Sequence, residues 1–360
     1  MNLKPSQSSA LEFVRRYATS RRDQAQQRIA HILEMSNISQ NDYNQALSSI
    51  FDYGRIAIHF HPDRLTPDSL TVAESILSSA SYKSQFETFL SSGKLSPNMG
   101  GPRDRWENRM FGDSYVGLDV SVSDRPKYGA FNLMLLPDGP CPRFGSCHFI
   151  LSPRILKRCT FTYLDSYLEP KERGTIDNFE DIISSLLADS FEREFVLGEN
   201  EIRPGKLIKH LKDNLKNPFE DPSSKPAARN LDFYIEAQIH GDINLSTDVD
   251  ILVYDPSFIG TETGENLKKI CERFDIDSYS HCGFSMKSEN FPDNFRGPKM
   301  PSLATRVASS GIINAKLIGD AAAELASKAE IWSDRGTSEE ILQELKLLWH
   351  VLVKYGARMT

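Results

Sequence analysis

The sequence predicts an α+β fold, with helices at both ends of the chain and short strands in its middle. Three observations support this class: helical periodicity near the N-terminus, period-two hydrophobic segments between residues 55 and 258, and an amphipathic C-terminal stretch. Helices and strands do not alternate regularly, as parallel βαβ units require. With 360 residues, the chain is long enough for two domains, or for one large domain with a smaller helical attachment.

Residues 1–50 are expected to form an N-terminal helical segment. Ser9 and Glu12 match a capping box, and apolar residues continue at helical spacing to residue 35. The same stretch carries a basic cluster, Arg15, Arg16, Arg21 and Arg22. We interpret this cluster as a solvated helix face in preference to a binding site for an acidic partner. Three roles stay open for the segment: a transport signal, a chaperone-binding segment or a part of the fold.

A strand is predicted to begin near Arg55. Ile56, Ile58 and Phe60 alternate with Ala57, His59 and His61 until Pro62 ends the run, so both histidines should share one face. A helix is expected over 72–93, closed by Gly93. Residues 94–117 are expected to be an irregular loop, and a loop of that length suggests a function.

The middle of the chain holds further strand candidates. They are expected over 128–136, 146–152, 158–164, 232–241 and 248–258. Helical patterns at 177–191 and 205–215 predict an insertion spanning about 172–225, which is either a substrate-recognition module or a structural cover. We therefore expect one domain over 51–330, built on a split, mostly antiparallel sheet.

The segment 331–360 is expected to be a C-terminal helix. Thr337 and Glu340 form a capping box, and Gly356 follows the helical stretch. The apolar stripe between them consists of Ile341, Leu345, Leu348, Leu352 and Tyr355.

Composition excludes several classes of protein. The net charge of −7 gives no electrostatic reason to expect nucleic-acid binding. The longest apolar runs are shorter than the roughly 20 residues of a membrane-spanning helix, and the N-terminus lacks a secretory signal. The five cysteines contain no CxxC pair, so a reducing compartment is expected. The protein is expected to be cytoplasmic, or delivered into a host cell by a specialised secretion system.

Common catalytic motifs are absent from the sequence. No GxGxxG, Walker or GxSxG pattern occurs, and Cys147 and His148 would point to opposite faces of a strand. The segment "HFHPDR" permits three readings: a J-domain motif, which its preceding strand disfavours, a metal site built on His59 and His61, or a plain strand edge. A His/Asp metal-dependent hydrolase therefore stays open as an alternative, although no metal is expected at the preferred site.

Several segments in chain order resemble a known family. The His-bearing strand, "FETFLSSGKLSP" and "RMFGDSYVG" are similar to the start of the poly(ADP-ribose) polymerase type of ADP-ribosyltransferase fold. More closely, "IHFHPDR", "GGPRDRWENRMFG", "PRFGSCHF" and "EAQIHGDINLSTDVDILVYDPSF" resemble a bacterial and fungal family long classed as of unknown function. That family includes effector transferases that ADP-ribosylate ubiquitin on a threonine. The resemblance covers most of residues 50–330.

This resemblance implies a PARP-like fold, NAD as cofactor and ubiquitin as the protein partner, with neither nucleic acid nor membrane involved. It implies Glu236 as the catalytic glutamate, paired with an acid for which Asp113 is the first choice and Asp104 the second. The residues expected to contact NAD are His59, His61, Arg64, Arg103, Asp104, Phe111, Gly112, Tyr115, Tyr128, Phe144, Ser146 and Gln238. Gln238 stands two residues after Glu236, where some other transferases carry a second glutamate.

The sequence therefore predicts a mono-ADP-ribosyltransferase that modifies a protein hydroxyl and thereby blocks ubiquitination. A catalytically inactive ubiquitin- or nucleotide-binding module on the same fold is the second possibility. A monomer is the expected oligomeric state.

Overall fold

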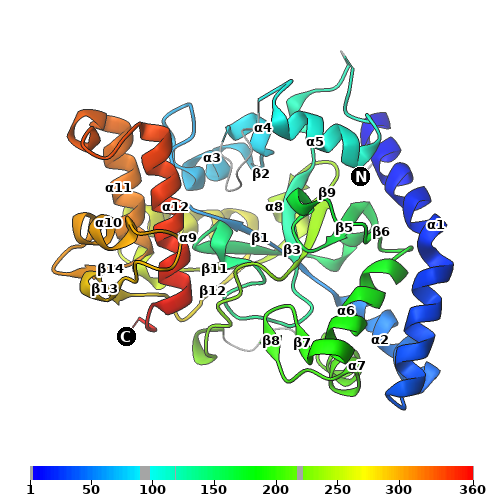
Figure 1. Ribbon diagram of the computed structural model, residues 1–360. Helices are drawn as coiled ribbons and strands as arrows, with labels where there is room; N and C mark the ends of the chain where they lie inside the picture. The colour runs from blue at the N-terminus through cyan, green and yellow to red at the C-terminus, as the bar shows by residue number, and fades with distance from the viewer. Residues whose placement is uncertain (1–2, 90–97, 118, 217–221, 360) are drawn as a thin grey trace.

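The computed structural model describes residues 3–89, 98–117, 119–216 and 222–359. An eight-stranded sheet lies at the centre, in the order β12-β11-β4-β1-β3-β9-β5-β6 (Figure 1). The strand pairs are antiparallel except β11 with β12, which is parallel. The strands of this sheet are β1 Ile56–Phe60, β3 Lys127–Phe131, β4 Cys147–Leu151, β5 Cys159–Tyr163, β6 Arg173–Thr175, β9 Ile235–Ile239, β11 Val249–Tyr254 and β12 Asp277–Ser280.

The predicted α+β class and the mostly antiparallel sheet are confirmed, but the sheet is continuous where a split one was expected. The reason is β9, which pairs with β3 on one side and with β5 on the other and so joins the two halves. β12 was not expected, because its exposed, polar residues carry no strand periodicity. It forms by adding to the edge strand β11 after a helical crossover.

One face of the sheet is apolar and forms the main core. Phe60, Phe131, Phe149 and Phe161 lie on this face, and all four are buried. Helices α6 Glu180–Arg193 and α7 Pro204–Asp213 contribute buried leucines and isoleucines to the same core, as does α2 Gln40–Tyr53. Helices α6 and α7 of the predicted insertion therefore cover part of this face of the sheet.

The N-terminal helix α1 extends over Pro5–Met35 and packs along α6 and β6 (Figure 1). It begins four residues before the expected capping box at Ser9, because Pro5 stands at its first turn and Lys4 precedes it. Its basic cluster is solvated only in part: Arg16 is exposed, whereas Arg21 pairs with Asp181 at 2.6 Å and Arg15 with Asp177 at 3.0 Å. The segment is thus part of the fold.

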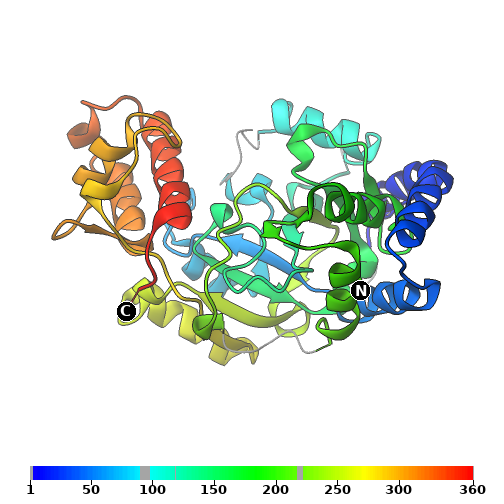
Figure 2. The ribbon, with the colours of Figure 1, turned by 60° about the horizontal axis from the view of Figure 1, so that its bottom comes forward.

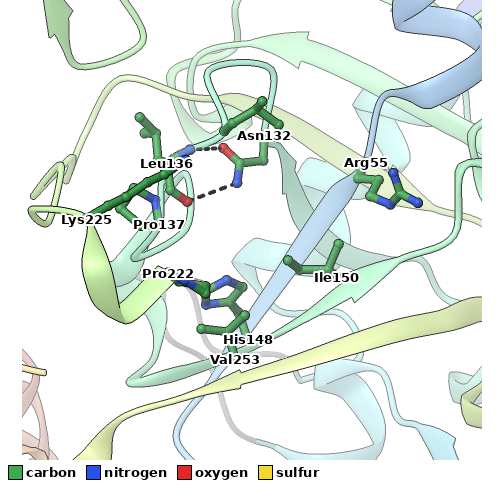
Figure 3. Close-up of a pocket in the computed structure, with 10 residues that line it drawn as sticks. Arg55, Asn132, Leu136, Pro137, His148, Ile150, Pro222, Lys225 and Val253 are labelled. Atoms are coloured by element: carbon green, nitrogen blue, oxygen red, sulfur yellow. Dashed lines mark hydrogen bonds between the residues drawn. The ribbon is translucent and has the colours of Figure 1, made fainter. Parts of the chain in front are cut away.

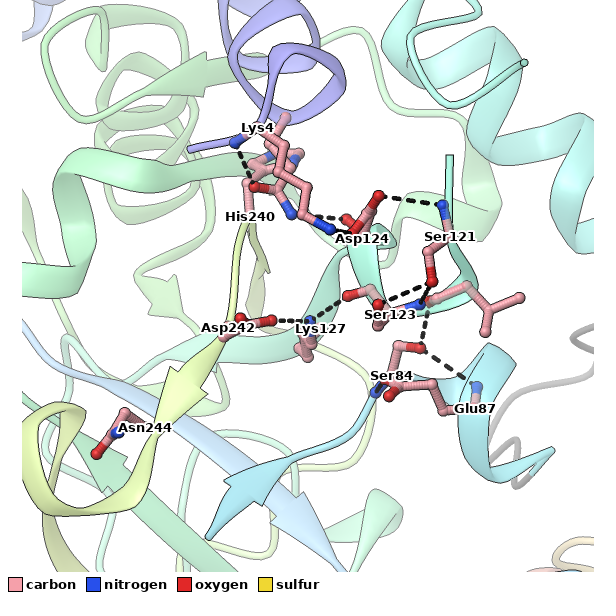
Figure 4. A network of polar contacts seen from close by, with 12 residues as sticks. Lys4, Ser84, Glu87, Ser121, Ser123, Asp124, Lys127, His240, Asp242 and Asn244 are labelled. Carbon is pink, nitrogen blue, oxygen red and sulfur yellow. Dashed lines mark hydrogen bonds and ion pairs between the residues drawn. The ribbon is translucent and has the colours of Figure 1, made fainter. Parts of the chain in front are cut away.

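A polar network ties the start of α1 to the chain before β3 (Figure 4). Lys4 forms an ion pair with Asp124 at 2.5 Å, and Gln7 Nε2 donates to the Asp124 carbonyl at 3.1 Å. Lys127 is buried below them, where its Nζ donates to the Ser123 carbonyl at 2.8 Å. The N-terminal end of α1 is therefore held to the chain that leads into β3.

Two expectations between β1 and β3 are wrong. The helix expected over 72–93 is divided into α3 Val72–Ser79, β2 Ser81–Tyr82 and α4 Gln85–Thr88, because Ala80 adopts a left-handed conformation that ends α3. Gly93 lies outside the described residues. The expected loop contains a ten-residue helix, α5 Pro102–Phe111, started by Pro102 and ended by Gly112 in a left-handed conformation.

The C-terminal part forms a helical group at one edge of the sheet (Figure 2). It contains α10 Met300–Val307, α11 Ala315–Ser327 and α12 Ser338–Tyr355, with β13 Met286–Lys287 paired to β14 Ile312–Ile313. The capping box of Thr337 and Glu340 is confirmed, and so is the buried stripe of α12, except that Tyr355 is exposed. The remaining elements are β7 Phe195–Val196, β8 Glu199–Asn200, β10 Ile243–Asn244, α8 Leu245–Asp248 and α9 Glu262–Phe274.

Candidate active site

The second face of the sheet is polar, and it is buried as well. The side chains of Tyr234, Glu236, Gln238 and His240 alternate along β9 toward this face, as predicted, and all are at most 7% exposed. Glu236 pairs with Ala130 of β3 and with Thr162 of β5, so it lies on an interior strand of the sheet. Burying this many polar groups requires partners for each of them.

Glu236 receives two hydrogen bonds on one carboxylate oxygen. The Ser166 hydroxyl donates to Oε1. Gln238 Nε2 donates to the same oxygen at 3.0 Å. Burial, and next the negative charge of Asp165, raise the pKa of Glu236 to about 7. The Ser166 and Gln238 hydrogen bonds and the nearby Arg103 guanidinium act in the opposite direction. Glu236 therefore titrates near neutral pH.

Helix α5 lies over this part of the sheet and supplies Arg103. The Arg103 guanidinium lies 4.4 Å from the ring centroid of Tyr128 and 5.5 Å from that of Trp106. Trp106 Nε1 donates to the Ser166 carbonyl at 3.1 Å, which fixes the segment that holds Glu236. Two of the predicted NAD contacts, Arg103 and Tyr128, are thus brought next to the predicted catalytic glutamate.

A buried ion-pair network lies behind Arg103. The Tyr128 hydroxyl donates to Glu107 at 2.6 Å, and Arg125 Nη1 donates to the other oxygen of Glu107 at 3.1 Å. Arg125 also pairs with Asp104, whose second oxygen accepts from the Gly100 amide at 2.7 Å. Asp104 is therefore engaged in a structural ion pair, on the far side of Arg125 from Glu107.

Asp113 is not placed beside Glu236. It is exposed, with a φ of 56°, in the turn that follows α5, at the opposite end of the helix from Arg103. The described structure records no contact between its carboxylate and Glu236. The acid whose charge reaches Glu236 is Asp165, which precedes Ser166 and forms an ion pair with Arg143.

Phe111, Gly112 and Tyr115 have packing roles. Phe111 and Tyr115 are buried in a small apolar cluster with Val14 of α1. A Cβ at Gly112 would lie 2.3 Å from the Phe13 ring, so α1 approaches here as closely as glycine allows. The Tyr115 hydroxyl lies 2.5 Å from His240 Nδ1, and His240 Nε2 contacts Thr160. Tyr115 thereby closes one end of the polar network on β9.

Phe144 lies at the other end of that face. Its ring meets Tyr234 edge to face at 5.7 Å, and the Arg143 guanidinium lies 4.5 Å from the Phe144 centroid. Arg143 also donates to the Tyr234 hydroxyl at 3.0 Å. Aromatic rings therefore flank Glu236 in two places, at Tyr128 and at Tyr234 with Phe144.

The predicted histidine strand is confirmed, and both of its histidines are neutral. Burial lowers the pKa of His59 to about 3 and holds that of His61 well below its ordinary value. His59 lies against His148, with ring centroids 4.7 Å apart, and His61 Nδ1 is 3.5 Å from the Ser146 hydroxyl. Among the described residues, no group of three or more His, Cys, Asp or Glu side chains is arranged to hold a metal ion.

Two hollows lie on the polar side of the sheet. The first, of about 460 Å³ including its opening to solvent, is lined by side chains that include Asn132, His148 and Lys225 (Figure 3). None of the residues that line it is a predicted NAD contact. The second, of about 310 Å³ including its opening, is lined by Trp106, Thr162 and Ser166, the neighbours of Glu236.

A protein-family model described as "Protein of unknown function (DUF3626)" matches residues 55–355, most of this chain. The chain belongs to the DUF3626 family. No curated protein matches this sequence significantly.

The region of this DUF3626 protein that the family model covers contains the whole sheet, the polar face and α12, and it begins after α1 and α2. All fourteen predicted site residues fall inside it. Within the ranges that the structure describes, no helix has both the length and the apolar character needed to cross a membrane. The five cysteines are all buried and unpaired.

Several residues of the site were not expected from the sequence. Asp165 and Ser166 follow β5, and they lie near Glu236 because β5 pairs with β9. The local sequence does not predict this pairing. Arg143 was also not expected, because its contact with Tyr234 joins residues that are far apart in the sequence. Glu107 had a visible signal, because it follows Arg103 by four residues, the spacing of an ion pair on a helix.

Proposed function

We propose that this protein is an NAD-dependent mono-ADP-ribosyltransferase that modifies a protein hydroxyl, with a threonine of ubiquitin as the first acceptor to test. The observation that carries the proposal is the environment of Glu236. Its carboxylate is buried on an interior strand of the sheet, held at one oxygen by Ser166 and Gln238, and lies near Arg103. The PARP-like motifs in the sequence supply the choice of cofactor and acceptor.

Buried polar atoms without a partner fit a large polar ligand on this side of the sheet. Among the described residues, Arg103 Nε, His59 Nε2 and Arg64 Nη2 are buried and have no hydrogen-bond partner. Such groups are rare in folded proteins unless a ligand or water completes them. A dinucleotide offers phosphate oxygens, hydroxyls and an amide in sufficient number. Arg103, Tyr128 and Phe144 would hold its flat groups by stacking.

NAD supplies an ADP-ribosyl group whose bond to nicotinamide breaks with positive charge developing on the ribose. A fixed carboxylate beside that carbon stabilises the charge, and this is the role of Glu236. Ser166 and Gln238 hold Oε1, so Oε2 is the oxygen that faces the ligand. Because Glu236 must be ionised to act, activity should rise with pH through its pKa near 7.

The hydroxyl acceptor needs a base to remove its proton. General-base catalysis of this kind contributes about 10²- to 10⁴-fold. Asp165 is favoured over Asp113 for this role, because its charge acts on Glu236 whereas Asp113 is exposed at the far end of α5. In the free protein Asp165 is paired with Arg143, so the base role requires that pair to open or to be shared.

The test is intact-mass spectrometry of ubiquitin after incubation with the protein and NAD. We expect one ADP-ribose unit per ubiquitin with the wild type and none with Glu236→Gln. Glu272→Gln, an exposed carboxylate change on α9, should behave as the wild type. Asp165→Asn should reduce transfer by about 10²-fold or more, and Asp113→Asn should leave it within about twofold.

The outcomes separate the parts of the proposal. Release of nicotinamide without a mass gain on ubiquitin would show that the protein cleaves NAD and that ubiquitin is not its acceptor. If neither nicotinamide nor modified ubiquitin appears, the enzyme proposal fails and a binding module on this fold takes its place. If Asp113→Asn and Asp165→Asn reduce ADP-ribose transfer equally, the assignment of Asp165 in preference to Asp113 as the base is wrong.

A further inference from the structure

The second hollow lies between helix α5 and the chain that joins β5 to β6. Its volume of about 310 Å³ is near the lower limit for ligand pockets, so it suits one or two side chains better than a dinucleotide. Thr162 and Ser166 form its buried floor. Thr162 pairs with Glu236 across β5 and β9, and the Ser166 hydroxyl donates to Glu236 Oε1. The floor therefore adjoins the proposed catalytic carboxylate.

Helix α5 supplies an apolar wall of this hollow. Trp106 and Met110 are four residues apart on the helix, and both line the hollow with little exposure. Trp106 Nε1 donates to the Ser166 carbonyl at 3.1 Å, which fixes the indole ring against the floor. The wall is thus already formed in the free protein, and it offers apolar surface to the carbon atoms of an entering side chain.

Charged side chains lie at the opening of the hollow. Arg109 of α5 and Glu169, which follows β5, form an ion pair at 2.5 Å, and both are exposed. The hydrogen bond from Arg109, and to a smaller extent the charge of Arg173, lower the pKa of Glu169. The opening therefore stabilises an ionised carboxylate.

Arg173 of β6 also lines the hollow, and its charge is not paired there. Its Nε donates to the Pro170 carbonyl at 2.9 Å, and its guanidinium lies 5.4 Å from the ring centroid of Tyr17. Within the described part of the chain, neither of its Nη atoms has a hydrogen-bond partner, and it forms no ion pair. Its sequence neighbour Glu172 lies 3.8 Å from Arg21 instead. Two arginines and one glutamate thus leave the opening with an excess of positive charge.

We propose that the second hollow binds the acceptor segment of the protein substrate, and that this segment carries an acidic residue next to its hydroxyl residue. The hydroxyl side chain enters along Trp106 and reaches Ser166, beside Glu236. The acidic side chain pairs with Arg173, whose free N–H groups match a carboxylate. That the bound segment is the acceptor rests on the proposed function, whereas the binding of an acidic hydroxyl segment rests on the groups described above.

The test is NMR of the full chain, labelled with ¹⁵N at the tryptophan indoles, with two peptides as probes. Acetyl-Ala-Thr-Glu-Ala-amide has the proposed features, and acetyl-Ala-Thr-Lys-Ala-amide reverses the charge. The chain has three tryptophans, so loss of one signal in Trp106→Phe identifies the reporter. We expect the acidic peptide to shift the Trp106 signal and to bind at least about fivefold more tightly than the lysine peptide.

Variants of Arg173 show whether this preference comes from its charge. Arg173→Gln should remove the preference, and Arg173→Lys, which keeps the charge, should retain most of it. Arg154→Gln is the matched control, because Arg154 is an exposed arginine that does not line the hollow. This control should bind both peptides as the wild type does.

The proposal is wrong if neither peptide shifts the Trp106 signal, if both bind equally, or if Arg173→Gln keeps the preference. These titrations require no turnover, so they separate the two proposals. A preference for the acidic peptide without nicotinamide release from NAD would support the binding site and contradict the transferase. Nicotinamide release without a preference would support the transferase and contradict the binding site.

Discussion

At position 236 a carboxyl group is buried among Ser166, Gln238 and Arg103, and its ionisation has a cost that depends on pH. The folded-state pKa, about 7, lies above the ordinary value of 4.5. The folded protein therefore holds a proton that the unfolded chain has lost, and stability falls as the pH rises from 4.5 to 7.

We predict that Glu236→Gln removes this contribution. Between pH 5 and pH 8 the wild type should lose about 3 kcal/mol more stability than the variant, at roughly 1.4 kcal/mol for each pKa unit. Thermal unfolding midpoints measured at both pH values would test this. Glu272→Gln serves as the control, and an equal change in wild type and Glu236→Gln would show that Glu236 is ionised without cost in the folded state.

Single residues of the site were predictable where the local pattern contained the information. The alternation of polar residues along β9 pointed to Glu236 and Gln238, and Arg103 and Tyr128 came from the motifs. Asp165 was missed because its position beside Glu236 arises from strand pairing. The resemblance implies a partner acid with Asp113 as its first choice, but Asp113 is exposed in the turn after α5.

Among the elements, α1 is the one whose role the sequence left most open. An isolated reading of residues 1–50 leaves a transport signal possible, whereas the folded chain buries Ile29, Ile32 and Leu33 of α1 in the main core. The same core contains Ile182 and Leu186 of α6, so removing α1 would expose apolar surface of α6.

We predict that Ile32→Ala destabilises the protein by about 2–5 kcal/mol, the usual cost of a large-to-small change in a core. Ile32 is 2% exposed, whereas Met35, one turn later on the same helix, is 62% exposed. Met35→Ala should change stability by less than about 0.5 kcal/mol. Thermal unfolding of the two variants tests the point, and a small effect of Ile32→Ala would mean that α1 is dispensable.

Element boundaries were predictable where caps were strong and wrong where tertiary contacts overrode them. The α12 capping box set that helix correctly. The segment after β1 has helical periodicity throughout, yet Ala80 turns left-handed so that Ser81 and Tyr82 can pair with β10. The sequence predicts a loop over α5 because this helix contains mostly charged and polar residues. Only Trp106 and Met110, four residues apart, indicate a helical apolar face.

At the scale of the whole molecule, the C-terminal helices meet the sheet at a few close contacts. One of these joins α11 to the turn after β1, where a Cβ at Gly319 would lie 1.6 Å from an oxygen of Asp63. Only glycine permits this approach. The contact therefore sets how closely the helical group and the end of β1 come together.

We predict that Gly319→Ala destabilises the protein, although glycine to alanine in a helix is ordinarily stabilising by up to about 1 kcal/mol. Asp63→Ala should relieve the clash, so the double variant should be more stable than the sum of the two single effects predicts. Gly205→Ala in α7, where a Cβ would meet nothing within 4 Å, should be neutral or stabilising. If the effects of Gly319→Ala and Asp63→Ala on thermal stability are additive in the double-mutant cycle, the two residues are not in close contact.

The α+β class, most strands, the polar face of β9 and the final helix follow from local chemistry: periodicity, capping and turn residues act over a few neighbouring positions. The order of the eight strands, the docking of α1 and the close approach of Gly319 to Asp63 do not. They join residues separated by up to hundreds of positions, and they are selected because burial of one continuous core outweighs local preference. For the same reason the sequence predicts Glu236 as a site residue, whereas Asp165 and Ser166, which shift its pKa, are found beside it only in the folded chain.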